Sequence, residues 1–347
     1  MLGTLIRDWL ENVSEQRSTQ LVLDQKIVLA TDVGLQRNEN QDRVAALQFT
    51  PNNSTMRPFI CVAVSDGMGG MLNGAECATI TIAELFSSLI SNAEVSADAK
   101  LRTAASHSNE AVYQFAKGKG GATLSAVLVE NDGSAYYLNV GDSRIYVVPN
   151  DRSDIVRATI DDTLHEAFGG QSRELVQFVG IGRVMLPRID RLPRDARSVF
   201  ITSDGAHYFD PSIFKQIILE ADTVRRGSER IIAIARWLGG PDNASIAAFH
   251  PSEILSKLTQ KPGSVATIWS GGGELQLAYA PQQVAYGGGA SEAPPPPIES
   301  ASEASSSEID SKRKQSRSRR KASKEKSSTK QLEIKIESGE NNDDADS

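Results

Sequence analysis

The chain has 347 residues, of which 39% are hydrophobic, so it can bury the core of one large domain or two ordinary ones. Its formal net charge of −7 excludes a general attraction to nucleic acid or anionic lipid. No apolar run approaches the roughly 18 residues that span a bilayer, and the N-terminus lacks the apolar core of a secretory signal. We therefore expect a soluble, cytoplasmic protein in which Cys61 and Cys77 are reduced core thiols.

Apolar residues at helical spacing open the chain and predict a helix within an N-terminal lead-in of residues 1–25. We expect this helix to pack on its own domain, with a membrane or partner anchor as the alternative. The stripe consists of Leu2, Leu5, Ile6, Trp9, Leu10 and Val13.

The patterns of residues 26–252 predict strands and helices in groups, and we expect this segment to form one domain, the catalytic one. Expected strands cover 26–32, 59–65, 122–130, 135–140, 144–148, 198–203 and 245–249, and expected helices cover 75–90, 97–116, 211–219 and 228–237. The turn Asn131-Asp-Gly-Ser134 is a strong hairpin signal. Helices between groups of hairpin-linked strands favour an α+β fold of packed antiparallel sheets over a parallel βαβ array.

The pattern weakens after residue 252. Val265–Trp269 and Glu274–Tyr279 flank three glycines and predict a peripheral β-hairpin within an extension of residues 253–286. Residues 287–347 are rich in Ser, Pro and charge and poor in large apolar side chains, so we expect a disordered tail. Its basic segment 312–330 could bind nucleic acid, an acidic protein or anionic lipid, or could be only a solvated tether.

Five aspartates lie where predicted strands end in turns: Asp42, Asp66, Asp142, Asp204 and Asp242. Any one of them alone would be read as a turn former. Several such positions in one domain predict a carboxylate cluster, which is tolerable only if cations neutralise its mutual repulsion. Oxygen ligands without His or Cys favour Mg²⁺ and Mn²⁺.

Six motifs, in order along residues 26–250, resemble those of the metal-dependent protein phosphatases of type 2C, in their bacterial form. They are Thr31-Asp-Val-Gly-Leu-Gln-Arg37-Asn-Glu-Asn40-Gln-Asp42, Asp66-Gly-Met-Gly-Gly70, Gly121-Ala-Thr123, Asn139-Val-Gly-Asp142-Ser-Arg144, Ser203-Asp204-Gly205 and Gly240-Pro-Asp242-Asn243. The resemblance implies two antiparallel sheets flanked by helices in an α-β-β-α sandwich. It also implies hydrolysis of phosphoserine and phosphothreonine in proteins by a water activated between two Mn²⁺ or Mg²⁺ ions.

The resemblance also implies residue roles. Asp66 would bridge both ions, and the carbonyl of Gly67 would bind the second. Asp204 and Asp242 would complete the shell of the first ion, and Asp42 would hold the second.

Two further residues receive roles from the same motifs. Asp142 would bind a third, weaker ion or instead hold the Gly141–Arg144 turn. Arg37 would bind the substrate phosphate, since its planar guanidinium suits phosphate oxygens. Asn243 is expected to shape its loop.

Some features depart from the family pattern. Met68 stands where many relatives have a His that could protonate the leaving alcohol, so water or another group must do so here. The stretch from Thr159 to Leu175 is short for the family's flap, which leaves substrate selectivity open. His207 is expected to be a helix-start or packing residue.

We expect phosphorylated proteins as substrates and a serine/threonine kinase acting on the same proteins. The alternative hypothesis is a catalytically weak or inactive binding module that regulates a kinase pathway. A complete set of aspartates argues against this alternative, since a decayed site usually loses its ligands first.

Overall fold

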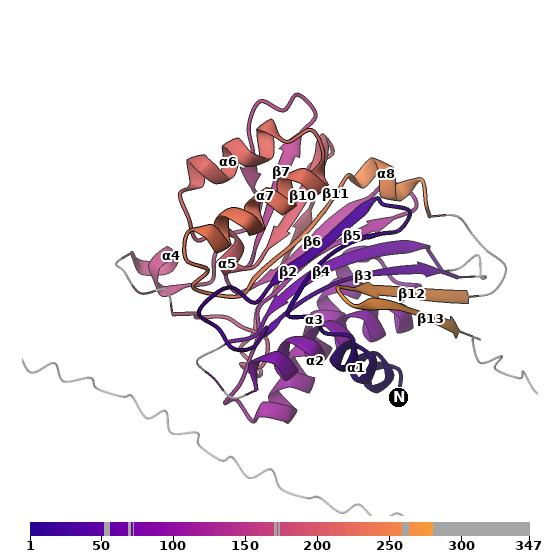
Figure 1. Ribbon diagram of the computed structural model, residues 1–347. Helices are drawn as coiled ribbons and strands as arrows, with labels where there is room; N and C mark the ends of the chain where they lie inside the picture. The colour runs from indigo at the N-terminus through magenta and orange to yellow at the C-terminus, as the bar shows by residue number, and fades with distance from the viewer. Residues whose placement is uncertain are drawn as a thin grey trace, which may run out of the picture. The chain divides into compact units, whose positions relative to one another are not determined.

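Two antiparallel sheets form the centre of the protein, shown in Figure 1. The computed structural model describes residues 1–51, 56–68, 71, 73–169, 172, 174–258 and 264–279. One sheet has the order β1 (Arg17–Val22), β2 (Ile27–Asp32), β11 (Ala244–Phe249), β10 (Ala196–Thr202), β7 (Arg144–Pro149) and β8 (Val156–Arg157). The other has the order β13 (Gly273–Tyr279), β12 (Ser264–Ser270), β3 (Asp42–Thr50), β4 (Phe59–Asp66), β5 (Leu124–Glu130), β6 (Ala135–Val140) and β9 (Arg188–Arg191).

Helices cover the outer face of each sheet (Figure 1). The seven-stranded sheet carries α1 (Leu2–Asn12), α2 (Gly74–Ser91) and α3 (Ala97–Ala116), and the six-stranded sheet carries α5 (Asp204–His207), α6 (Pro211–Glu220) and α7 (Val224–Trp237). Two short helices, α4 (Leu164–Phe168) and α8 (Pro251–Leu255), lie in connections. The predicted α-β-β-α sandwich is therefore confirmed.

Three apolar layers hold the sandwich together. Side chains such as Leu29, Val62 and Ile201 fill the space between the sheets and are fully buried. The faces turned away from this layer pack against helices, so strands such as β2 and β5 are buried along their whole length. Burial on both faces explains why their sequences are continuous apolar runs and not alternating ones.

The N-terminal helix packs on its own domain, as predicted. Ile6 and Leu10 are buried against α2 and the seven-stranded sheet, and Trp9 is partly buried beside them. Leu5, which belongs to the predicted stripe, is 46% exposed. Of the described residues, no helix combines the length and the apolar character needed to cross a membrane.

Strand β3 is the main element that the sequence pattern missed. Its residues Val44-Ala-Ala-Leu-Gln48 contain two alanines of low strand propensity and show no alternation. The strand is nevertheless central, because β4 pairs with it on one side and β12 on the other. The predicted hairpin after residue 264 exists as β12–β13 and extends this sheet. The tail expected to be disordered lies outside the described residues.

Candidate active site

The predicted aspartates gather at one end of both sheets. Asp42 begins β3 and lies opposite Asp66, which ends β4. Thr202, at the end of β10, pairs with the first residue of β7 and with Ile246 near the start of β11. The chain segments that carry Asp142, Asp204 and Asp242 therefore meet at the same level. Asp42 begins β3 and Asp242 lies just before β11, so neither follows the end of a strand, which corrects the expectation.

Glycines directly after two of these aspartates allow the backbones to approach closely. A Cβ atom on Gly67 would collide with the carbonyl of Gly74, and one on Gly205 would collide with the carbonyl of Asn243. The Cβ of Asp242 also lies 3.2 Å from the position of a Cβ on Gly205. Gly67 thus lets the turn after Asp66 pack closely against Gly74, and Gly205 lets the turn after Asp204 pack closely against Asp242 and Asn243.

Burial and neighbouring negative charge raise the pKa values of the clustered carboxyls. Burial is the main cause for Asp66, whose pKa is raised well above its ordinary value, with further contributions from the charges of Asp42, Asp204, Asp142 and Asp242. The pKa of Asp42 rises to about 7, again mainly through burial. The pKa of Asp142 also rises to about 7, through burial and then the charge of Asp204. These carboxyls are close enough to repel one another.

Asp204 is held in the middle of this group. Burial and then the charge of Asp242 raise its pKa, while a hydrogen bond with the Asp66 carboxyl acts in the opposite direction. One oxygen of Asp204, Oδ1, is buried without a hydrogen-bond partner among the described atoms. The same is true of Oδ1 of Asp42. Buried carboxylate oxygens of this kind are costly unless something pairs with them.

Two of the clustered aspartates, Asp42 and Asp242, interact with other side chains of the protein. Ser203 donates a hydrogen bond of 2.7 Å from Oγ to Oδ2 of Asp42 and is itself held by the backbone N–H of Ser245. Arg37 donates from Nη2 to Oδ2 of Asp242 at 2.7 Å. Within the described part of the chain, no three or more His, Cys, Asp or Glu side chains are arranged to hold a metal ion. This finding agrees with the mutual repulsion of the carboxylates and with the pairing of Asp42 with Ser203 and of Asp242 with Arg37.

The loop of Arg37 is fixed to the loop of Asp242. The backbone N–H groups of Leu35 and Gln36 both donate to the carbonyl of Gly240, at 2.8 and 3.2 Å. Asn243 bridges the same loops, because its side chain accepts from the N–H of Gln41 and donates to the carbonyls of Val33 and Glu39. The expectation that Asn243 shapes its loop is confirmed. Arg37 is 40% exposed, so its guanidinium lies at the solvent edge of the cluster.

The turn that carries Asp142 is held by residues that sequence reasoning did not single out. Oδ2 of Asp162 accepts a hydrogen bond of 3.0 Å from the N–H of Gly141, which has a φ of +98°. Arg144 donates to both oxygens of Asp161, at 2.9, 3.1 and 2.6 Å. Asp162 therefore helps to hold the turn on which Asp142 lies. Both acids lie in Thr159-Ile-Asp-Asp-Thr163, at the start of the short stretch that runs to Leu175, and this acidic pair was the signal that could have identified them.

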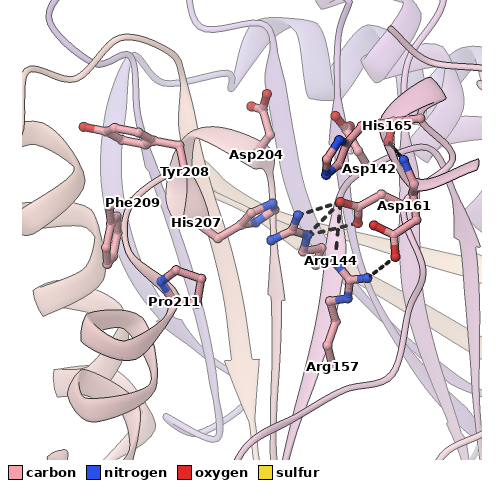
Figure 2. A pocket seen from close by; sticks show the side chains of 12 residues that line it. Asp142, Arg144, Arg157, Asp161, His165, Asp204, His207, Tyr208, Phe209 and Pro211 are labelled. Atoms are coloured by element: carbon pink, nitrogen blue, oxygen red, sulfur yellow. Dashed lines mark hydrogen bonds and ion pairs between the residues drawn. The ribbon is translucent and has the colours of Figure 1, made fainter. Parts of the chain in front are cut away.

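A cavity of about 610 Å³ opens beside the cluster (Figure 2). Asp142 and Asp204 lie on one side of it, and Arg144 lies between His207 and Asp161. His207 ends α5, is 8% exposed and makes a hydrogen bond of 2.8 Å with Thr202, so its expected packing role is confirmed and the expected place at a helix start is wrong. A substrate group bound at the carboxylates would have room to extend into this cavity.

We expect the metal-free protein to lose stability as pH rises from 5 to 7.5. The pKa values of Asp42 and Asp142 are raised in the folded state, so between about pH 4 and pH 7 the folded protein retains protons that the unfolded chain releases. A higher pH therefore favours unfolding, and the melting temperature in EDTA should fall by roughly 5–10 °C. Thermal melts across this range, with and without Mn²⁺, measure the effect. A flat or rising melting temperature in EDTA would contradict the carboxylate cluster.

The family model and the related sequences all point to the same protein family. The model of protein phosphatase 2C matches residues 35–238. A protein phosphatase 2C-type protein of Streptococcus pyogenes is 27% identical over 248 residues, which cover 65% of this chain and 97% of that relative. The serine/threonine protein phosphatase PstP of Mycobacterium tuberculosis is 28% identical over 241 residues, which cover 62% of this chain and 43% of PstP. The match to PstP thus spans less than half of that relative's length.

Solved structures share the fold. The Ser-Thr phosphatase MsPP of Mycobacterium smegmatis, in complex with cacodylate, superposes with a TM-score of 0.54 and 21% identity, covering 67% of this chain and 99% of MsPP. The catalytic domain of PstP, in complex with two manganese ions, gives a TM-score of 0.52 and 23% identity, covering 65% of this chain and 97% of that domain. At this level of identity the likeness supports the fold alone.

Proposed function

Because this chain belongs to the protein phosphatase 2C family, whose model matches residues 35–238, we propose that its aspartate cluster holds two divalent cations that serve phosphoester hydrolysis. The chain is a metal-dependent serine/threonine protein phosphatase. The observation that supports the site assignment is the set of carboxyls at one end of the two sheets that raise one another's pKa values. Cations would convert this repulsion into attraction.

The donor atoms present fit divalent cations. Oδ1 of Asp42 and Oδ1 of Asp204 are buried acceptors without a partner among the described atoms, and the cluster offers oxygen ligands only. Asp66, Asp204 and Asp242 would hold one ion, and Asp66, Asp42 and the carbonyl of Gly67 would hold the second. Such ligands suit Mn²⁺ and Mg²⁺. PstP, which is related in sequence to this chain, has a catalytic domain solved with two manganese ions, and this relative favours Mn²⁺.

A third ion is proposed at Asp142. Its pKa is raised to about 7 by burial and by the charge of Asp204, and the neighbouring turn is held by Asp162, whose Oδ2 accepts from the N–H of Gly141. A cation bound to Asp142 would offset this burial and repulsion. It lies on the wall of the cavity beside the cluster, which is the side from which substrate would enter (Figure 2).

The protein's own groups bind and orient the substrate. Bound divalent cations lower the pKa of a coordinated water and polarise the phosphoryl group. Arg37 binds the phosphate, since its guanidinium keeps its charge at any working pH and offers paired N–H donors. The Met68 side chain cannot donate a proton, so the leaving serine or threonine oxygen takes its proton from water or from another group.

Phosphorylated proteins are the proposed substrates, since the relatives include a serine/threonine protein phosphatase. A kinase acting on the same proteins and a partner for the basic segment 312–330 remain predictions, as does the cytoplasmic location. An inactive binding module is the alternative that the complete set of aspartates argues against.

Metal removal tests the proposal. After dialysis against EDTA, the full chain should release no phosphate from p-nitrophenyl phosphate or a phosphothreonine peptide, and Mn²⁺ or Mg²⁺ should restore release. Calorimetry with Mn²⁺ alone is the second measurement. Full activity in excess EDTA would refute the metal-dependent mechanism, while absence of both Mn²⁺ binding and turnover would favour the binding module.

A further inference from the structure

Two cavities beside the carboxylates are parts of one groove. The cavity next to Asp142 and Asp204 measures about 610 Å³, and a second cavity measures about 390 Å³. Both are lined by Arg144, Arg157, His207 and Pro211, so the two cavities adjoin at these four residues. We call this combined space the side groove. It begins at the candidate active site and leads away from it over the start of α6.

The far end of the side groove combines a group of apolar residues with charged ones. Tyr146, Ile155 and Phe214 line it, with the rings of Tyr146 and Phe214 4.7 Å apart between centroids. Tyr146 is 8% exposed and Phe214 2%, so both rings are fixed by the core below. Ile155 is half-buried and faces the same space. A space of about 390 Å³ accommodates one large apolar side chain.

The charged groups along the side groove are already paired. Arg144 binds Asp161, Arg157 binds Glu166 at 2.6 Å, and Lys215 binds Asp154 at 2.7 Å. Figure 2 shows Arg144 and Arg157 converging on Asp161. A charged ligand group entering the far end would therefore meet charges that already have partners. An apolar ligand group would displace only water.

We propose that the side groove binds the polypeptide on one side of the phosphorylated residue of a protein substrate, with an apolar side chain seated between Ile155 and Phe214. This rests on the proposed function, because that function places the phosphate at the carboxylates from which the groove leads. Small phosphoesters do not extend into the groove, so they are hydrolysed without its help. The groove therefore selects among protein substrates.

A panel of phosphothreonine peptides tests this proposal on the full chain loaded with Mn²⁺. Each peptide carries Leu, Gly or Glu at one position within four residues of the phosphothreonine, and p-nitrophenyl phosphate is the small reference substrate. At one position, on one side, kcat/KM should be about tenfold higher for Leu than for Gly, and lowest for Glu. The side on which the preference appears gives the direction of the bound chain.

Ile155→Glu and Val156→Glu form a matched pair of variants. Val156 is 51% exposed and does not line the side groove, whereas its neighbour Ile155 does. Ile155→Glu should lower the ratio of kcat/KM for the Leu peptide to that for p-nitrophenyl phosphate about tenfold, and Val156→Glu should leave this ratio unchanged.

The outcomes separate the two proposals. Equal turnover across the peptide panel, or an unchanged ratio in Ile155→Glu, overturns the groove while turnover of p-nitrophenyl phosphate still supports the phosphatase. An absence of Mn²⁺-dependent turnover of any substrate by the unaltered chain overturns the proposed function and the groove with it.

Discussion

Asp204→Asn should reduce Mn²⁺-dependent kcat/KM by about 1,000-fold or more. Asp204 lies in the middle of the cluster, where its carboxyl meets Asp66, feels the charge of Asp242 and keeps one buried oxygen without a partner among the described atoms. An amide keeps the shape of the side chain but removes its charge and one acceptor oxygen. Cation binding at this position would weaken accordingly, and phosphate release from p-nitrophenyl phosphate measures the loss.

The same substitution, which should lower activity, should raise the thermal stability of the metal-free protein. Removing a like charge from the cluster relieves repulsion, so Asp204→Asn should melt at a higher temperature than the unaltered chain in EDTA at pH 7.5. Mn²⁺ should then add less stability than it adds to the unaltered chain.

Asp222→Asn is the matched control. Asp222 is 60% exposed and pairs with Arg226 on the surface, so its replacement should change neither activity nor the response to Mn²⁺. If Asp204→Asn kept most of its activity, Asp204 would not be a cation ligand.

The Asp-Gly turns could be predicted from sequence because their signals are local. Asp66-Gly67 and Asp204-Gly205 each follow an apolar strand, and only glycine fits where the next backbone approaches. The order of six motifs then placed them in one domain. By contrast, β3 was missed because it is buried on both faces and contains Ala45 and Ala46 where a typical strand has branched side chains.

Long-range pairing is the part of the site that local patterns could not supply. Ser203 holds Asp42 across 161 residues, and Arg37 pairs with Asp242 across 205. Such contacts depend on which strands are neighbours, and the sheet order is not encoded in any short segment. The side groove has the same origin, since Ile155 lies in the connection between β7 and β8 whereas Phe214 lies in α6.

Arg37→Ala should lower kcat/KM for a phosphothreonine peptide by about 100-fold. Its guanidinium lies at the solvent edge of the cluster, bound to Asp242 at 2.7 Å, where an incoming phosphate would meet it. Arg37→Lys keeps the charge but not the planar pair of donors, so it should recover only part of the loss.

Measuring Mn²⁺ binding distinguishes whether Arg37 acts by binding substrate or by organising the cation site. In the structure Arg37 competes for Asp242, one of the proposed cation ligands, and its positive charge opposes a cation nearby. Arg37→Ala should therefore bind Mn²⁺ at least as tightly as the unaltered chain, as measured by calorimetry, although its turnover is poor. If excess Mn²⁺ instead restored full turnover to Arg37→Ala, Arg37 would act by organising the cation site, and the phosphate would have to be bound by another group.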